Sequence, residues 1–184
     1  MAINDPFSEL VHELDRTRGA LRAAVDAVEP ELRKRKPAPE AWSVAEVLEH
    51  LGIVERRITQ LLTRFIAQAR EARMPEPNVP ESIVHSIDMA TVRDRSRKVA
   101  SSEVHLLPIR GLEATTAWLE LETARRALLA VIADAQRIDL SSTRYPHFIL
   151  GPLNGYQWLA FVAGHEARHT AQIEEIASRV SHCV

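Results

Sequence analysis

The amino-acid sequence predicts an all-α fold, a four-helix bundle with one long crossover between its second and third helices. Four segments carry apolar residues at helical spacing, and none alternates apolar and polar residues persistently enough to predict a sheet. A connection of roughly 35 residues, from Met74 to Gly111, separates the two pairs of segments, and connections of this length are often functional. Two helices, a long connection and two more helices are typical of a bundle with one crossover.

The first predicted helix runs from about Asp5 to Val28. Its apolar residues repeat at spacings of four, seven and four, which places them on one face: Leu10, Leu14, Leu21 and Val25. Three prolines then predict a linker: Pro30, Pro37 and Pro39.

The second predicted helix begins at Ser43. Ser43 and Glu46 have the spacing of a capping box, in which each side chain accepts a hydrogen bond from the other residue's backbone N–H. An apolar stripe follows on one face: Val47, Val54, Leu61 and Phe65. The pattern fades near Arg73, and the prolines after it end the helix.

The rest of the chain predicts two further helices. The long connection has room for a short helix near Ser82–Arg97. The third long helix is expected from about Thr115 to Arg137, followed by a loop over Asp139–Gly151. Pro152 suits the first turn of the fourth helix, which continues to about Val180.

The composition is that of an ordinary globular protein, and residues 1–184 are predicted to form a single domain. Hydrophobic residues make up 46% of the chain and charged residues 26%. The formal net charge is -2, from 23 basic and 25 acidic side chains, so electrostatics gives no support for a nucleic-acid partner.

The sequence favours a cytoplasmic location. Cys183 is the only cysteine and therefore forms no internal disulfide. The first residues lack the apolar segment of a signal peptide, so no leader is expected. No apolar run approaches the ~18 residues that span a bilayer, so no membrane association is expected either.

Three of the eight histidines fall on apolar helix faces. His165 and His169 are four residues apart in the fourth predicted helix and share its apolar face. His50 lies on the apolar stripe of the second helix, whereas His12 falls opposite the leucines of its helix and is expected in solvent. The remaining histidines lie in predicted loops or the tail and carry no comparable signal: His85, His105, His147 and His182.

The three histidines on apolar faces predict a site for one divalent metal ion, because buried imidazoles are costly unless their nitrogens find partners. Neutral imidazole suits zinc, nickel, copper or iron, and three histidines leave a coordination position for water or substrate. The alternative is three separately hydrogen-bonded core histidines. The segment from His165 to His169 also matches H-E-x-x-H, but no third-ligand continuation of a zincin protease follows it.

Glu46 and Gln172 are the predicted catalytic residues around this metal site. Glu46 lies one turn before His50 and could accept the free N–H of a ligand histidine, with its capping-box role as an equal alternative. Gln172 lies one turn after His169 and could bond a metal-bound water or a substrate, or satisfy nearby backbone groups. Two tryptophans are expected to be core anchors: Trp42 and Trp158.

Two sequence blocks surround the predicted ligands. One runs from Trp42 to Leu51 and contains His50, and the other runs from Gly151 to Ile173 and contains His165 and His169. These blocks resemble the DinB superfamily of four-helix-bundle metalloproteins, in the branch that includes bacterial thiol S-transferases. The resemblance extends over nearly the whole chain and is specific for the superfamily, not for one reaction.

The resemblance implies an up-down-down-up bundle, a zinc- or nickel-type ion and a homodimer. Characterised relatives transfer a low-molecular-weight thiol, such as bacillithiol, mycothiol or glutathione, onto an electrophile. A metal lowers the pKa of a bound thiol, and because Cys183 lies at the tail, the thiol is expected as a cosubstrate. Two other functions stay open: a metal-dependent hydrolase that uses metal-bound water without a thiol, and a non-catalytic metal-binding stress-response dimer.

Overall fold

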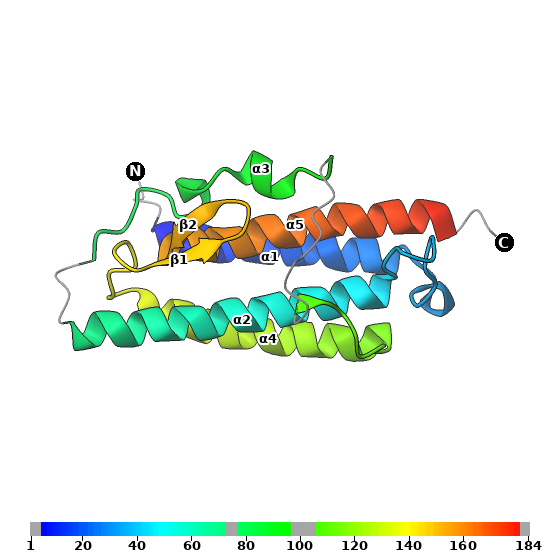
Figure 1. The fold of residues 1–184 in the computed structure, drawn as a ribbon, viewed down its shortest axis with the longest axis horizontal. Coiled ribbons are helices and arrows are strands. Elements are labelled where there is room, and N and C mark those ends of the chain that lie inside the picture. The colour runs from blue at the N-terminus through cyan, green and yellow to red at the C-terminus, as the bar shows by residue number, and fades with distance from the viewer. Residues whose placement is uncertain (1–4, 73–76, 97–105, 181–184) are drawn as a thin grey trace.

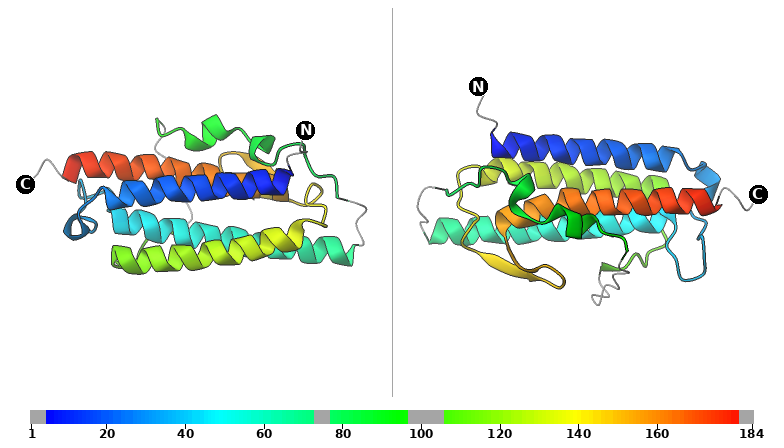
Figure 2. Two further views of the ribbon diagram at one scale, coloured as in Figure 1. Left: turned by 180° about the vertical axis from the view of Figure 1, so that it is seen from behind. Right: turned by 90° about the horizontal axis from the view of Figure 1, so that it is seen from above.

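Four long helices form a bundle in the computed structural model, which describes residues 5–72, 77–96 and 106–180 (Figure 1). They are α1 (Pro6–Asp26), α2 (Val44–Glu71), α4 (Ala114–Ala135) and α5 (Gly155–Val180). Helices α1 and α5 run in one direction and α2 and α4 in the other, as Figures 1 and 2 show. This is the up-down-down-up arrangement, so the predicted all-α four-helix bundle is confirmed.

Three of these helices begin at side chains that replace the hydrogen bonds missing from a first helical turn. The Asp5 carboxylate accepts backbone N–H groups at the start of α1. The predicted capping box of Ser43 and Glu46 is present at the start of α2. Asn154 and Gln157 exchange the same pair of bonds before α5, each 3.0 Å long.

No helix within the described ranges combines the length and apolar character that crossing a membrane requires.

The bundle core has an apolar cluster toward each end and a layer of buried polar side chains between them. Along α1, Leu14 belongs to one apolar cluster and Leu21 to the other, and Thr17 lies between them. The other three long helices contribute one buried charged residue each at this level. The buried polar layer therefore consists of Thr17, Glu55, Arg125 and Glu166.

The connection between α2 and α4 returns along the whole bundle, because these two neighbours run parallel (Figure 1). Its described part contains a 3₁₀ turn (Val84–Ser86) and α3 (Met89–Arg93), both of which pack on α5 (Figure 2). Helix α3 approaches α5 closely at Gly164, where a Cβ atom would lie 2.7 Å from Val92 Cγ1. The short helix expected within Ser82–Arg97 is thus present in a shorter form.

A two-stranded antiparallel hairpin lies beside the bundle, formed by β1 (Arg144–His147) and β2 (Gly151–Asn154) (Figure 1). The sequence predicted a loop here and placed Pro152 in the first helical turn, and both predictions are wrong. Pro152 lies in β2 opposite Pro146, and α5 begins only at Gly155. Strands of four residues are too short to display a period-two pattern, and proline is uncommon in strands, so no strand signal was visible.

Candidate metal centre

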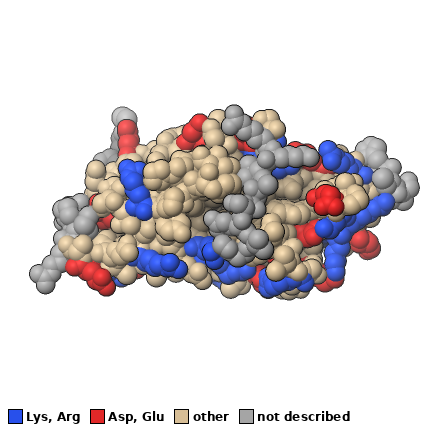
Figure 3. Space-filling view, in the orientation of Figure 1, with Lys and Arg blue, Asp and Glu red and all other residues tan. Residues whose placement is uncertain are grey.

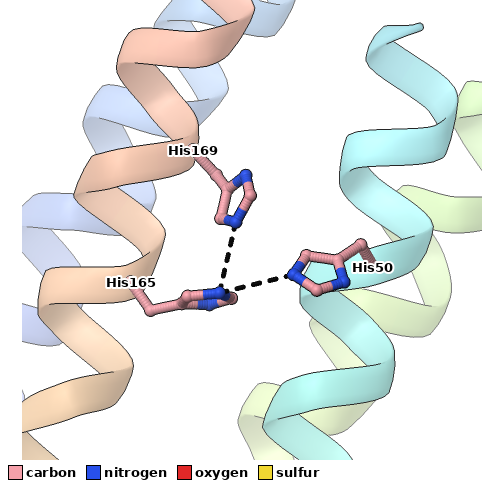
Figure 4. Close-up of side chains that lie close together, drawn as sticks. All are labelled: His50, His165 and His169. Atoms are coloured by element: carbon pink, nitrogen blue, oxygen red, sulfur yellow. Dashed lines mark hydrogen bonds between the residues drawn. The ribbon is translucent and has the colours of Figure 1, made fainter. Parts of the chain in front are cut away.

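Three histidine side chains from α2 and α5 meet between these helices (Figure 4). His50 lies near the start of α2, and His165 and His169 lie one turn apart in α5. His165 Nε2 is 3.4 Å from His50 Nε2 and 3.2 Å from His169 Nε2. The structure therefore brings together all three predicted metal ligands, and it shows no second cluster of this kind in the described ranges.

The separations of the three Nε2 atoms match the edge of a metal coordination sphere. Two nitrogens that are each about 2.1 Å from an ion at a tetrahedral angle lie about 3.4 Å apart. The separations of 3.4 and 3.2 Å are close to this value, and the ligand atoms of all three residues lie within 4.8 Å of one another. One divalent ion therefore fits between them with small adjustments.

Hydrogen bonds on the far side of two rings fix where their protons lie. His50 Nδ1 is 2.7 Å from the carbonyl oxygen of Leu106, and His169 Nδ1 is 2.7 Å from Oε1 of Gln172. Both oxygens only accept hydrogen bonds, so each Nδ1 carries the proton and each Nε2 of these two neutral rings presents a lone pair. A proton on His165 Nε2 could be donated to only one of these two lone pairs. A cation, in contrast, would accept a lone pair from all three Nε2 atoms.

Burial lowers the pKa of all three imidazoles. Desolvation is the main cause at His50, where the hydrogen bond to Leu106 opposes the shift. At His165 and His169 the pKa falls well below the ordinary value, because burial acts together with neighbouring histidines. All three rings are therefore neutral near pH 7, which is the form that ligates a metal.

Aromatic rings flank the three imidazoles. Phe161 stacks on His165 with their ring centroids 5.1 Å apart. Trp42 lies 4.9 Å from the His50 ring and stacks on His169 at 6.3 Å. Trp42 is only half-buried and contacts two of the candidate ligands, so it shields the centre and is not simply the core anchor that the sequence suggested.

Positive charge gathers near His169. Arg95 donates to both carboxylate oxygens of Glu175, at 2.7 and 2.8 Å, and its Nη1 lies 3.5 Å from Gln172 Oε1. Burial lowers the pKa of Arg168, and repulsion from Arg95 lowers it further. Two arginines and their acidic neighbours, Asp94 and Glu175, therefore lie near His169, whereas the side near His165 is aromatic.

The two predicted catalytic residues have different surroundings. Gln172 accepts the hydrogen bond from His169 Nδ1, which is the contact of a residue that orients a ligand. Glu46 accepts the Ser43 backbone N–H at 2.8 Å, and its other oxygen lies 2.8 Å from Lys36 Nζ. Within the described ranges Glu46 does not contact a ligand histidine. The structure thus supports the capping-box role for Glu46, and a catalytic role for either residue stays a prediction.

The glutamate of the H-E-x-x-H pattern lies in the buried polar layer. Glu166 accepts hydrogen bonds from Thr17 at 2.7 Å, Arg18 at 2.7 Å and Arg125 at 3.2 Å. Arg125 also donates to Glu55 at 2.6 Å. These contacts tie all four long helices together, so Glu166 has a packing role and not the general-base role that a zincin pattern would assign.

His147 was missed by the sequence reasoning because its segment was predicted to be a loop. It lies at the end of β1, with its ring centroid 4.7 Å from that of Phe161 and 5.5 Å from that of Trp158. One phenyl ring thus separates His147 from His165. The sequence carries no signal that could have placed it there, because the hairpin has no detectable strand pattern.

Known proteins resemble this chain in both sequence and fold. The curated Bacillus subtilis (strain 168) protein named "Uncharacterized protein YuaE" is 29% identical over 147 residues, which are 79% of this chain and 83% of that protein. The solved structure described as TT2238, a four-helix bundle protein, superposes with a TM-score of 0.62 at 22% identity, covering 92% of this chain and 98% of that one. The sequence pattern of the DinB superfamily matches residues 13–173. Since this match spans most of the sequence and includes all three histidines, the chain belongs to the DinB superfamily.

Proposed function

We propose that the protein is a metal-dependent transferase that joins a low-molecular-weight thiol to an electrophilic substrate, with zinc or nickel as the ion. The observation that carries this proposal is the convergence of three neutral imidazoles from two helices on one point. Three protein donors leave a coordination position for an exchangeable ligand. Membership of the DinB superfamily supports the proposal, because the branch that the sequence resembles includes thiol S-transferases.

The chain's own contribution is a set of preoriented donors. When bound, the ion lowers the pKa of a coordinated thiol, which makes the thiolate available near neutral pH. The Leu106 carbonyl orients His50, and Gln172 orients His169. Because both hydrogen bonds hold the proton on Nδ1, neither Nε2 has to release a proton before ligation. The hydrogen bonds on Nδ1 thus preorganise two of the three side chains that would hold the ion.

The arginines near His169 support a thiol that carries carboxylates. Arg95 and Arg168 lie beside His169 and Gln172, and the pKa of Arg168 is lowered by burial and by Arg95. A carboxylate of the thiol would replace Glu175 as the partner of the Arg95 guanidinium. This arrangement supports binding of the thiol on the His169 side and leaves the aromatic side for the electrophile.

Metal analysis of the purified protein, followed by a panel of thiols and electrophiles, tests the proposal. We expect about one equivalent of zinc or nickel per chain. The metal-loaded protein should accelerate attack of a thiol on an epoxide, an aryl halide or a maleyl compound. Chelation should abolish the rate and readdition of metal should restore it, whereas Cys183→Ser should change nothing because the thiol is a cosubstrate.

Four results would contradict the transferase proposal. Full activity after metal removal would exclude the role of the ion, and dependence on Cys183 would exclude a cosubstrate thiol. Cleavage of an ester or amide without any thiol would assign the same ligands to a hydrolase. Stoichiometric metal without turnover of any panel member, in a protein stabilised by that metal, would favour a non-catalytic metal-binding role.

A further inference from the structure

A continuous series of aromatic rings connects the hairpin to the candidate metal centre. Phe161 stacks on His165 at 5.1 Å and contacts Trp158 at 5.6 Å with the rings nearly perpendicular. His147 packs against both of these rings, and Tyr145 lies 6.4 Å from Trp158. The hairpin thus supplies part of an aromatic wall that begins next to a candidate ligand.

The indole of Trp158 holds a buried hydrogen-bond donor that lacks an acceptor. The residue is 8% exposed, and its Nε1 atom has no hydrogen-bond partner within the described ranges. A buried unpaired donor costs stability and calls for an explanation. The sequence analysis expected Trp158 to be a core anchor, but an anchor chosen for packing alone would be better served by phenylalanine, which has no N–H group.

Hydrogen bonds within the hairpin turn fix the tautomer of His147. Its Nδ1 accepts the backbone N–H groups of Ile149 and Leu150, each at 3.2 Å. In the neutral ring the proton is therefore on Nε2. These two bonds also hold the ring in place against Phe161, which makes His147 a rigid part of the aromatic wall.

We propose that Trp158, Phe161 and His147 form the subsite for the electrophile. Its ligand is an uncharged aromatic molecule with an oxygen that accepts the hydrogen bond of Trp158 Nε1. The inference rests on the proposed transferase function and adds to it the chemical class of the second substrate. The three rings would bind and orient this molecule next to His165.

The character of the surrounding surface favours an uncharged aromatic ligand. Figure 3 shows mostly uncharged side chains over the part of this face where the hairpin lies. Three large apolar side chains of the hairpin are about half exposed: Tyr145 at 52%, Phe148 at 52% and Ile149 at 47%. The guanidinium groups near the centre lie on the opposite side, beside His169. Arg144 is the one Lys, Arg, Asp or Glu side chain in the two strands; it is exposed and donates to the Pro152 carbonyl oxygen at 3.4 Å.

Two-dimensional NMR of the zinc-loaded protein, labelled with ¹⁵N in its tryptophans, tests this subsite without any turnover. The probe is 1-acetonaphthone, an uncharged aryl ketone with no leaving group, added in the absence of thiol. We expect a saturable downfield shift of the Trp158 indole N–H signal, which is assigned by its loss in Trp158→Phe. Trp158→Phe should weaken probe binding about fivefold, the contribution of one hydrogen bond.

Matched variants separate the subsite from general effects on the fold. Trp118→Phe is the control, because Trp118 lies beside Arg18 and Arg22, away from the hairpin, and its loss should leave probe binding unchanged. His147→Ala should weaken binding by removing one wall of the subsite. It should leave the metal content unchanged, because His147 is not one of the candidate ligands. The shift in the unaltered protein remains informative even if Trp158→Phe folds poorly.

Four outcomes would overturn the inference. The first is the absence of a saturable shift, and the second is equal weakening by Trp118→Phe. The third is an upfield indole signal that the probe does not move, which would show that Trp158 donates to the ring of Phe161. The fourth is a fall in molecular mass caused by Phe148→Ser, together with no probe binding, which would make this face an interface between two copies.

Failure of the transferase proposal would give a different result from failure of the aromatic subsite. If the probe shifts the Trp158 signal but no thiol and electrophile pair is turned over, the transferase function falls and the aromatic site remains as a ligand site. If transfer is observed but the probe does not bind, the transferase function stands and the electrophile binds elsewhere.

Discussion

His165 occupies the middle of the candidate metal centre. Its Nε2 is the atom that lies within 3.4 Å of both other ligand nitrogens, and burial together with His169 and His50 lowers its pKa well below the ordinary value. Hydrogen bonds on Nδ1 orient His50 and His169, whereas no such bond orients His165 within the described ranges. The packing of Phe161 against the ring holds it instead.

Replacing the residues next to the ligands separates their roles. Gln172→Ala should weaken metal affinity on the order of 10- to 100-fold, because His169 loses the acceptor that holds its tautomer and orientation. Glu46→Ala should leave metal affinity unchanged and lower the free energy of unfolding by about 1 kcal/mol through loss of the capping box. Competition with a chelating dye and urea unfolding measure the two effects. If Glu46→Ala weakened metal binding as much as Gln172→Ala, the ligand-orienting role predicted for Glu46 would be retained.

Acid should destabilise the metal-free protein through the same imidazoles. Their pKa values are lowered in the folded state, so below the ordinary histidine pKa of about 6.5 the unfolded chain binds more protons than the folded chain. Stability is therefore fully present above this pH and is lost as the pH falls toward the folded-state pKa values. Urea unfolding of stripped protein at about pH 7.5 and about pH 5.5 measures the loss.

Two substitutions, one at a buried histidine and one at an exposed histidine, provide the control for this pH dependence. His165→Phe removes one buried titrating group and should reduce the loss of stability between the two pH values. His12→Phe removes an exposed histidine and should leave the loss unchanged. Equal behaviour of the two variants would assign the acid sensitivity to other groups.

The ligands themselves could be predicted from sequence, but their hydrogen-bond partners only in part. His50, His165 and His169 have recognisable spacing on apolar helix faces, and Gln172 lies one turn along the same face. Leu106 could not be predicted, because any residue supplies a backbone carbonyl and its position depends on the path of the crossover.

At the scale of the helices, Arg125 joins α4 to α2 and α5 by bonds to two buried carboxylates. Burial raises the pKa of Glu55, and the positive charge of Arg125 opposes this shift. Both carboxylates also pair with Arg18, so two guanidinium groups together offset the cost of burying two negative charges. The buried polar layer therefore depends on both Arg125 and Arg18.

Arg125→Met should destabilise the protein by roughly 3 kcal/mol, because it removes the more deeply buried of the two guanidinium groups that pair with Glu55 and Glu166 and leaves Arg18 as their counter-charge. Arg70→Met is the matched control, since Arg70 also joins α2 to α4 but pairs with Asp134 at the exposed surface. Its cost should stay below about 1 kcal/mol. Guanidinium chloride unfolding of both variants gives the comparison, and equal costs would show that the layer contributes no more than a surface ion pair.

The long helices were predictable because each repeats an apolar pattern over several turns and has a recognisable start. The hairpin was not, because four residues per strand carry too little pattern and its prolines argue against a strand. The buried polar layer was missed for a different reason. Arg125 lies 70 residues from Glu55 and 41 from Glu166, so its partners become visible only when the helices are packed.

At the scale of the whole molecule, the homodimer implied by the family resemblance stays a prediction. We expect light scattering at micromolar concentration to give a mass near twice 20.7 kDa. A mass of one chain for the unaltered protein would contradict the dimer and leave the metal site unaffected.

The buried polar layer also sets how the helices align along their axes. If α5 slid by one helical turn, about 5.4 Å, Glu166 would leave Arg125 and enter one of the apolar clusters. A charge buried without its partner costs several kcal/mol, so the displaced alignment is strongly disfavoured. The same slide would move His165 and His169 along the bundle axis away from His50, so the three ligand nitrogens would no longer converge. The salt bridges of the buried polar layer thus hold the three imidazoles at the same height in the bundle, with or without a bound metal.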